Sequence, residues 1–324
     1  MSLKQNVLYC LNNKEYISGQ NIADTLNVSR AAVWKAIQGL IKEGYKIEAV
    51  TNKGYKIMED NDVISVECIK QHLKNNSKLK FEYIREVDST NNLMKERFKD
   101  GVEEGYVIVA SLQTKGKGRL GRSFYSPEGS GIYMSILLKP DFSAENASML
   151  TAAAAVAVVK AIDKLSNRQC QIKWVNDIYL NNKKVCGILS EASYNMENRK
   201  LDYVIVGIGI NVYEPDKGFP EDIKNIASQV FLNKKGNMRN KLIASVCEEF
   251  FDIYNNFESK DFVKEYQKRN MLYGKDINII SSLGIKQAKA LDIDDNCHLK
   301  VQLKSGEIQS ISSGEVSVKE VRKN

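Results

Sequence analysis

Residues Gln113–Arg122 have the sequence Gln-Thr-Lys-Gly-Lys-Gly-Arg-Leu-Gly-Arg, in which three glycines alternate with four cationic side chains. Apolar runs at Tyr106–Ala110 and Tyr133–Leu138 flank this segment, so we expect it to join two strands. Glycines let the backbone approach a ligand closely, and the cations neutralise an anion. The spacing fits neither a Walker loop nor a dinucleotide fingerprint, and no helix is expected to follow. The segment therefore predicts an unpaired, mobile loop that orders on a phosphate or carboxylate; the alternative is a solvated basic hairpin.

The chain around this loop, from about residue 65 to 270, alternates strands with helices, which predicts a mixed sheet of the α/β or α+β class. Beyond Leu272 the pattern changes to short strands, which predicts a small β-barrel. The remaining elements expected in the central region are strands at Ile172–Trp174, Val185–Ala192 and Tyr203–Ile210 and helices at Ala147–Leu165 and Lys241–Phe257. The strands expected near the C-terminus are Asp276–Ile280, Lys286–Asp292, His298–Leu303, Glu307–Ser312 and Glu315–Glu320.

Three further segments of the central region combine polar and small residues with apolar strands. They are Lys-Trp-Val-Asn-Asp at 173–177, Lys-Lys-Val-Cys-Gly-Ile-Leu at 183–189 and Gly-Ile-Gly-Ile-Asn at 207–211. A lysine that enters a buried strand is costly unless an anion pairs with it. Glycines inside an apolar strand mark a place where a ligand or another backbone comes close, although simple strand crowding explains them equally well.

The first sixty residues form a separate pattern of three helices and a hairpin. Ser18 is expected to cap the second helix and Ser29 the third, Arg30–Leu40. The hairpin joins Tyr45–Val50 to Tyr55–Met58 through a turn that contains Asn and Gly. This order of elements predicts a winged helix-turn-helix. The side chains expected to face the core are Val7, Leu8, Leu11, Ile22, Ala23, Leu26, Val33, Ala36, Ile37 and Leu40.

The outer face of the third helix carries small and polar side chains, so the helix fits a DNA major groove while the hairpin presents lysines to the phosphates. Residues 1–60 hold eight Lys/Arg and six Asp/Glu, so charge alone does not decide for DNA. The alternative is a helical domain that contacts protein. The predicted DNA-contacting residues are Ser29, Arg30, Ala31, Trp34, Lys35, Gln38, Lys53 and Lys56.

Composition excludes several classes of function. The 324 residues carry a formal net charge of +7, which permits an anionic partner without requiring one. There are two histidines and six cysteines without a Cys-x-x-Cys pair, which disfavours a multi-histidine metal site, a zinc ribbon and a Ser-His-Asp triad. No signal peptide or membrane-spanning run is apparent, so the sequence predicts a cytoplasmic protein with reduced thiols and no membrane partner.

Five motifs in order, Ser89-Thr90-Asn91, the glycine and cation loop, and the segments at 173–177, 183–189 and 207–211, resemble biotin protein ligases. With the N-terminal unit included, the chain resembles the bifunctional form that is also the biotin operon repressor. The resemblance implies a class II synthetase-like central domain and an SH3-like C-terminal barrel. The domains implied are a DNA-binding domain at 1–62, a catalytic domain at 63–271 and a β-barrel at 272–324.

The resemblance also implies a reaction. Biotin and ATP give biotinoyl-5′-AMP and pyrophosphate, with Mg²⁺ on the phosphates, and the biotinoyl group passes to a lysine of the biotin carboxyl carrier protein of acetyl-CoA carboxylase. A homodimer with bound biotinoyl-AMP represses biotin synthesis genes at operator DNA. No metal ligands are assigned by the resemblance.

Site residues are carried over position by position. Lys184 and Arg119 match catalytic positions. The positions implied to bind biotin are Ser89, Thr90, Asn91, Gln113, Gly116, Lys117, Gly118, Arg119, Lys184, Gly207 and Gly209. The positions implied to bind ATP or the adenylate are Arg119, Arg122, Trp174, Asn176, Asp177 and Asn211. Two residues depart from the family pattern. Lys117 replaces an arginine, which loses a bidentate donor but keeps the charge, and Val175 replaces a proline.

The chemistry agrees with these residue types. Joining a carboxylate to ATP brings two anions together, so cations must offset their repulsion and stabilise the charge that builds on the α-phosphate. A loop that closes keeps the mixed anhydride from water. Two alternatives stay open at this point: a lipoate ligase-like adenylating enzyme, and a ligand-sensing repressor without ligase activity.

Overall fold

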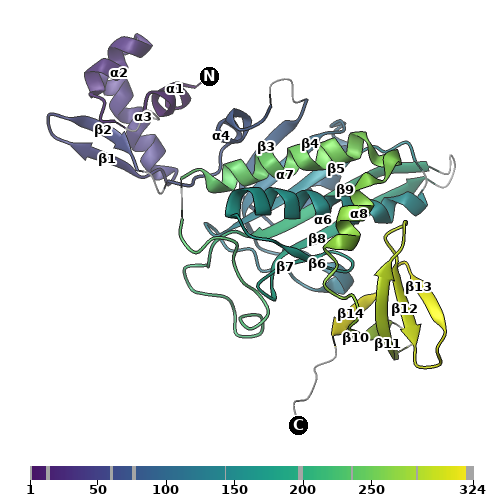
Figure 1. The fold of residues 1–324 in the computed structure, drawn as a ribbon. Coiled ribbons are helices and arrows are strands. Elements are labelled where there is room, and N and C mark those ends of the chain that lie inside the picture. Colours follow the sequence, from purple (N-terminus) through teal and green to yellow (C-terminus); the bar gives the residue numbers. More distant parts are fainter. Residues whose placement is uncertain are drawn as a thin grey trace. The chain divides into compact units, whose positions relative to one another are not determined.

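The computed structural model describes residues 2–11, 15–58, 61–74, 78–142, 144–195, 200–234, 236–281 and 284–318. The chain divides into two compact units (Figure 1). Met1–Leu73 and Leu232–Ala244 form the first, and Lys74–Phe231 with Ser245–Asn324 form the second. No helix in the described ranges is both long enough and apolar enough to cross a membrane.

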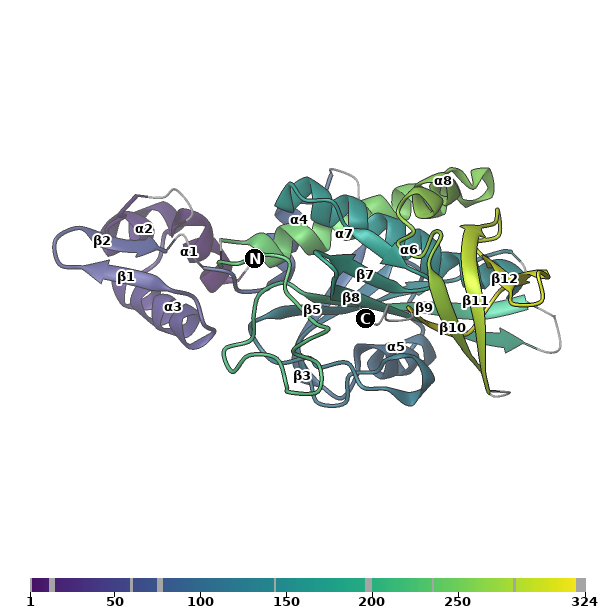
Figure 2. The ribbon, with the colours of Figure 1, turned by 60° about the horizontal axis from the view of Figure 1, so that its bottom comes forward.

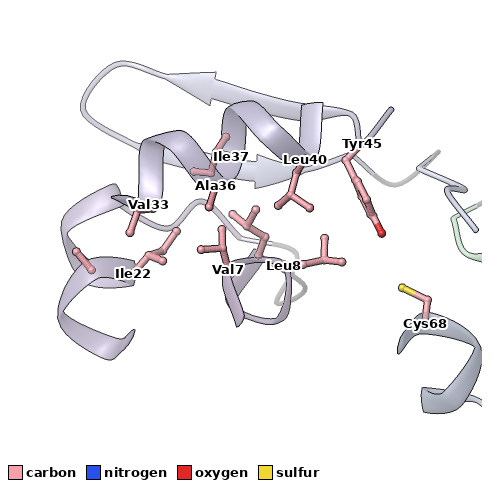
Figure 3. Close-up of a cluster of buried hydrophobic side chains, with 11 residues drawn as sticks. Val7, Leu8, Ile22, Val33, Ala36, Ile37, Leu40, Tyr45 and Cys68 are labelled. Carbon is pink, nitrogen blue, oxygen red and sulfur yellow. The ribbon is translucent and has the colours of Figure 1, made fainter. Parts of the chain in front are cut away.

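The first unit contains the predicted helices and hairpin. Ser18 and Ser29 cap α2 and α3, and each side-chain oxygen accepts a hydrogen bond from the backbone N–H three residues later. The expected helix faces pack into one core, which Tyr45 and Cys68 of α4 complete (Figure 3). The winged helix-turn-helix is therefore confirmed. The elements are α1 Leu3–Leu11, α2 Gly19–Leu26, α3 Arg30–Lys42, β1 Ile47–Val50, β2 Gly54–Ile57 and α4 Val66–Gln71.

A second stretch of chain completes this unit. Asp62 receives a hydrogen bond from the backbone N–H of Arg239 and forms an ion pair with its guanidinium, with 3.0 Å between Nε and Oδ2. Asn240 accepts from the backbone N–H of Ser65 and donates to the carbonyl of Val63. Both side chains of the Asp62–Arg239 pair are almost fully buried. The start of α7 (Met238–Asn255) thus belongs with the N-terminal residues, a long-range pairing that no local sequence pattern announces.

The second unit is built on a mixed sheet of seven strands in the order β3-β4-β5-β9-β8-β7-β6. The pair β3–β4 is parallel and the other pairs are antiparallel. Helix α6 (Ala144–Ser166) covers one face, over β6 to β9, and α5 (Thr90–Lys99) packs on the other, against β4, β5 and β9 (Figure 2). Every residue of β5 is buried. The strands are β3 Lys80–Val87, β4 Tyr106–Gln113, β5 Gly131–Leu138, β6 Gln171–Lys173, β7 Asp177–Leu180, β8 Lys183–Asn195 and β9 Lys200–Asn211.

The five C-terminal strands are confirmed as an antiparallel sheet in the order β13-β12-β11-β10-β14. Trp174 Nε1 donates to the carbonyl of Cys297 at 2.9 Å, and Tyr266 Oη donates to the carbonyl of Val175 at 2.8 Å. The strands are β10 Asp276–Ser281, β11 Gly284–Ile293, β12 Leu299–Leu303, β13 Ile308–Ile311 and β14 Glu315–Val318. Lys319 and Glu320, at the predicted end of the last strand, lie outside the described residues.

Some predicted boundaries were inexact. The predicted strand Ile172–Trp174 ends at Lys173, and the helix predicted at Lys241–Phe257 is Met238–Asn255. Five elements were not predicted from the sequence: β3, β7, α4, α5 and α8 (Asp261–Lys268). The residues of β3 alternate only weakly in burial. The short 3₁₀ helices η1 (Arg119–Gly121) and η2 (Phe257–Ser259) complete the fold.

Candidate functional site

A cavity of about 400 Å³ opens at the sheet of the second unit. The sequence motifs reach it from α5, from the loop after β4, and from β6 to β9. Of the residues predicted to bind biotin or ATP, Gly116 alone is not in the wall. The predicted residues that line the cavity are Ser89, Thr90, Asn91, Gln113, Lys117, Gly118, Arg119, Arg122, Trp174, Asn176, Asp177, Lys184, Gly207, Gly209 and Asn211.

One part of the wall is a network of neutral hydrogen-bonding groups. The backbone N–H and hydroxyl of Thr90 lie 2.9 and 3.1 Å from Gln113 Oε1. The buried hydroxyl of Ser135 lies 2.7 Å from Thr90 Oγ1 and 2.6 Å from Asn91 Oδ1. Ser89 precedes α5 without a side-chain capping bond. Amide and hydroxyl groups held in fixed positions can recognise an uncharged polar ligand group.

Asn91 is oriented by a carboxylate behind it. Its amide donates to Glu191 Oε2 at 2.7 Å, and Lys95 pairs with the other oxygen of Glu191 at 2.6 Å. Burial opposes the charge of Glu191, but the hydrogen bonds from Lys95 and Asn91 hold its pKa below the usual value. Ser135 and Glu191 were not predicted. Each lies within a strand and belongs to no motif, so no local sequence pattern identifies it.

The glycines of β9 leave room for side chains from other elements. A Cβ on Gly207 would lie 2.3 Å from Asn91 Oδ1, and one on Gly209 would lie 2.5 Å from the ring of Phe124. The close approach is to protein side chains that themselves line the cavity. Phe124, which follows the cationic loop, was also missed by the sequence analysis.

The loop from Gly116 to Phe124 is paired with itself, contrary to the prediction of an unpaired segment. The N–H of Gly118 donates to the carbonyl of Arg122, and the N–H of Phe124 donates to that of Gly116. A Cβ on Gly116 would meet the Phe124 carbonyl at 2.4 Å, so glycine is required for this turn. Leu120 at its tip has a φ of 54° and is 71% exposed. The alternating glycines thus build a tight hairpin.

The cations form another part of the wall. Lys184 Nζ lies 2.6 Å from Asp177 Oδ1, which is the anion that a lysine in a buried strand requires. Arg119 donates to Asn176 Oδ1 at 3.3 Å and to the carbonyl of Gly314 at 3.0 Å, and Arg122 pairs with Glu315 at 2.7 Å. The start of β14 therefore contributes to the cavity, which the sequence analysis did not expect.

The chain after β9 forms another wall. The N–H of Lys184 donates to the carbonyl of Ile226, and the N–H of Ser228 donates to the carbonyl of Lys184, which fixes this chain beside β8. Its apolar members were not predicted because they belong to no regular element. They are Phe219, Ile223, Ile226 and Ala227. An apolar wall beside a cationic one suits a ligand that joins a flat ring to phosphate.

The predicted DNA-contacting residues all lie at the N-cap of α3, on α3 itself or in the hairpin of the first unit. Ser29, Arg30, Ala31, Trp34 and Lys35 are exposed, and Gln38 is half-buried. The Trp34 side chain is 53% exposed, which is unusual for an apolar residue of this size. The Lys53 and Lys56 ammonium groups lie 5.8 and 5.7 Å from the centre of the Tyr16 ring.

Comparison with known proteins decides the family. The chain is 35% identical to the Bifunctional ligase/repressor BirA of Bacillus spizizenii over 316 residues, 96% of each chain. It belongs to the bifunctional biotin ligase/repressor family. The Escherichia coli BirA is 27% identical, again over 96% of its own length.

The domain-level matches agree with this biotin ligase assignment. Residues 83–211 match the Biotin/lipoate A/B protein ligase family, residues 4–56 an HTH domain, and residues 273–319 the Biotin protein ligase C terminal domain. The structure titled biotin protein ligase from Aquifex aeolicus in complex with biotin and ATP matches with a TM-score of 0.63 and 31% identity. It covers 76% of this chain and all of its own. The predicted ligase and DNA-binding repressor classes are thereby confirmed for this biotin ligase/repressor.

Proposed function

We propose that this biotin ligase/repressor joins biotin to ATP in the cavity, giving biotinoyl-5′-AMP and pyrophosphate, and then transfers the biotinoyl group to a lysine of a biotin carboxyl carrier protein. We propose further that its homodimer, with biotinoyl-AMP bound, occupies operator DNA. The observation that carries the proposal is the convergence of fifteen predicted ligand-binding residues on one cavity with a neutral hydrogen-bonding side and a cationic side.

The neutral side suits the biotin ring. In the proposal, Ser89, Thr90 and Gln113 bind the ureido group, and Asn91 supports them through its bond to Glu191. Gly207 and Gly209 keep the strand beside the ring free of side chains. Burial of such groups makes recognition selective, because a ligand that lacks the matching polar atoms leaves them unpaired.

The cationic side suits the reacting groups. A biotin carboxylate oxygen attacks the α-phosphorus of ATP, the bond from that phosphorus to the bridging oxygen breaks, and pyrophosphate leaves. Lys184 and Arg119 stabilise the charge that develops on the α-phosphate. Lys117 contributes long-range charge, and its Nζ already contacts Asn92. In the second step the acceptor amine attacks the acyl carbon, loses a proton, and AMP leaves.

The nucleotide side is formed by the segment 173–177 and by Asn211. Trp174 donates its indole N–H to Cys297, so its role is to position the segment and the β14 edge together. Asn176 is held by a bond from its amide to the carbonyl of Ile188 at 2.7 Å, which aims its oxygen at Arg119. Arg122, Asp177 and Asn211 complete this side of the proposed adenylate site.

Magnesium belongs to the proposal as the counterion of ATP. Within the described ranges no three His, Cys, Asp or Glu side chains gather as metal ligands. Asp177 and Glu315, the two carboxylates of the cavity wall, already form ion pairs with Lys184 and Arg122. The donor set therefore fits an ion that arrives on the phosphates and takes at most one or two protein ligands.

Reduced thiols support the proposed cytoplasmic location. All six cysteines are free, and five of them are buried. Burial raises the pKa of Cys247 to about 12, so this thiol stays protonated and unreactive.

Incubation of the protein with biotin, MgATP and an unmodified carrier domain tests the ligase proposal. We expect the carrier to gain the mass of one biotinoyl group, and no gain when its acceptor lysine is replaced. Biotin-dependent exchange of pyrophosphate into ATP should exceed lipoate-dependent exchange. Exchange with lipoate alone would support the lipoate ligase alternative, and no exchange with either would leave a ligand-binding repressor.

A further inference from the structure

Lys173 is a cavity-lining lysine to which the motif comparison gave no role. It is the last residue of β6 and lies opposite Asp177 in the register of β6 and β7. Its Nζ lies 5.9 Å from the centre of the Tyr179 ring. Within the described part of the chain the ammonium of Lys173 forms neither a hydrogen bond nor an ion pair. This half-buried ammonium thus contacts an aromatic face, without a direct hydrogen bond or ion pair among the described residues.

The neighbouring acids form their ion pairs with other cations than Lys173. Asp177 lies 2.6 Å from Lys184, and Glu315 lies 2.7 Å from Arg122. Burial lowers the pKa of Lys173, and the charges of Lys184 and Arg122 lower it further, against the opposing effect of the two carboxylates. Burial also raises the pKa of Tyr179 to about 12, so the phenol stays neutral. Burial is therefore the main cause of the lowered pKa of Lys173, and a bound anion would favour its ammonium form.

The cavity wall as a whole carries a net positive charge. Five cations, Lys117, Arg119, Arg122, Lys173 and Lys184, face two carboxylates. Adenylate formation needs positive charge at two places, because charge builds on the α-phosphate and also on the departing pyrophosphate. Lys184 is fixed against Asp177 and against the chain at Ile226, so it serves one of these places. Lys173 lies opposite Asp177 on the neighbouring strand, has no ion-pair partner among the described residues, and is near enough to Lys184, Glu315 and Arg122 for their charges to affect its pKa.

We propose that Lys173 binds the β- and γ-phosphate oxygens of ATP and stabilises the departing pyrophosphate, whereas Lys184 and Arg119 act on the carboxylate and the α-phosphate. This division of roles rests on the proposed ligase function. It makes Lys173 a residue of the first half-reaction only, because biotinoyl-AMP carries neither of the phosphates that it contacts.

Separate measurement of the two half-reactions distinguishes a phosphate-binding role of Lys173 from a structural role. Lys173→Gln should raise the KM for ATP, and for pyrophosphate in the exchange reaction, by about 10–100-fold, as expected for one lost charged contact to phosphate. Transfer from prepared biotinoyl-AMP to the carrier domain should stay at the wild-type rate. Lys173→Arg should restore most of the exchange activity. Lys183→Gln provides the matched control, because Lys183 is exposed at the start of β8 and does not line the cavity.

Other outcomes overturn the proposal. An unchanged KM for ATP and pyrophosphate in Lys173→Gln would exclude the phosphate contact. Parallel loss of exchange, transfer and biotin affinity would show a structural role. Loss of transfer alone, with its pH profile moved to higher pH, would instead make Lys173 a base for the acceptor amine. Absence of exchange in the unaltered protein would refute the proposed function itself.

Discussion

At the scale of single residues, Lys184 carries the most specific prediction. Lys184→Ala should slow adenylate synthesis by at least about 10²–10³-fold, because it removes a charge directed at the transition state. The fold should survive, since the side chain is about one-third exposed and, among the residues that the structure describes, its ion pair is with Asp177 at the cavity wall. Biotin-dependent pyrophosphate exchange measures the effect, and the melting temperature controls for folding. Exchange near the wild-type rate in a folded variant would contradict the assignment.

Arg119 is predicted to slow the dissociation of biotinoyl-AMP from the protein. It now bonds to Asn176 and to the carbonyl of Gly314, and these neutral acceptors can be exchanged for phosphate when the adenylate binds. Arg119→Ala should chiefly accelerate the dissociation of biotinoyl-AMP, because the loop loses its anionic partner. Stopped-flow fluorescence with prepared biotinoyl-AMP follows this rate. A dissociation rate equal to that of the unaltered protein would argue against loop closure on the ligand.

At the scale of elements, the glycines of β8 and β9 predict a graded series. A Cβ at Gly207 or Gly209 would overlap Asn91 or Phe124, whereas one at Gly187 would lie 3.3 Å from Phe124. We expect Gly207→Ala and Gly209→Ala to weaken biotin binding, because Asn91 or Phe124 must shift within the cavity wall, and to cost about 1–3 kcal/mol of stability, as overpacking usually does. Gly187→Ala serves as the milder control on the neighbouring strand. Isothermal calorimetry gives the affinities, and a larger loss in Gly187→Ala than in Gly209→Ala would reverse the predicted order.

Elements with strong local signals were predicted well. The caps Ser18 and Ser29 and the buried face of α3 follow from short-range rules that the structure obeys. The hairpin turn at Asn52 and Gly54 was also expected, and both residues have positive φ. By contrast, α5 is rich in polar residues, and β3 mixes polar and apolar residues without strict alternation. Their places are decided by packing on the sheet, which periodicity does not reveal.

The candidate site shows the same division. The residues predicted from motifs line the cavity, with the exception of Gly116. Ser135, Glu191 and Phe124 were not predicted, because their contacts are with residues distant in the sequence. The contact of Glu315 with Arg122 is an extreme case, since it joins the C-terminal sheet to the cationic loop. The sequence predicted the chemistry of the site better than the set of residues that holds it in place.

At the scale of the whole molecule, removal of residues 1–60 should abolish operator binding and leave much of the ligase activity. The deletion removes α1–α3 and the hairpin but spares Asp62 and Val63, the partners of Arg239 and Asn240. A longer deletion, of residues 1–73, also removes these partners and should lower the melting temperature further. Electrophoretic mobility shifts and carrier biotinylation measure the two activities. Specific operator affinity in the shorter chain would refute the assigned DNA-binding face.

Ligand, dimer and DNA are predicted to be coupled. Two winged helices on a palindrome double the phosphate and base contacts of one, so dimerisation should control occupancy. If the adenylate binds the arginines of the Gly116–Arg122 hairpin and orders neighbouring segments, it removes part of the ordering cost of assembly, which corresponds to a coupling of about 1–3 kcal/mol. Sedimentation velocity and operator titration, each with and without biotin and MgATP, should show more dimer and tighter binding with ligand. Equal values in both states would leave a ligase whose DNA-binding unit does not sense biotin.

The pairing of Asp62 with Arg239 has a consequence for how such a chain can be gained or lost in evolution. The DNA-binding unit is not one continuous stretch of sequence. Leu232–Ala244 belongs to it, although sequence of the ligase unit lies on both sides of this segment. A winged helix transferred alone onto a shorter ligase would bring Asp62 without Arg239 and Ser65 without Asn240. Recombination at one point therefore leaves these buried residues without their partners. Transfer of a stable DNA-binding unit requires matching changes in two separated stretches of the gene.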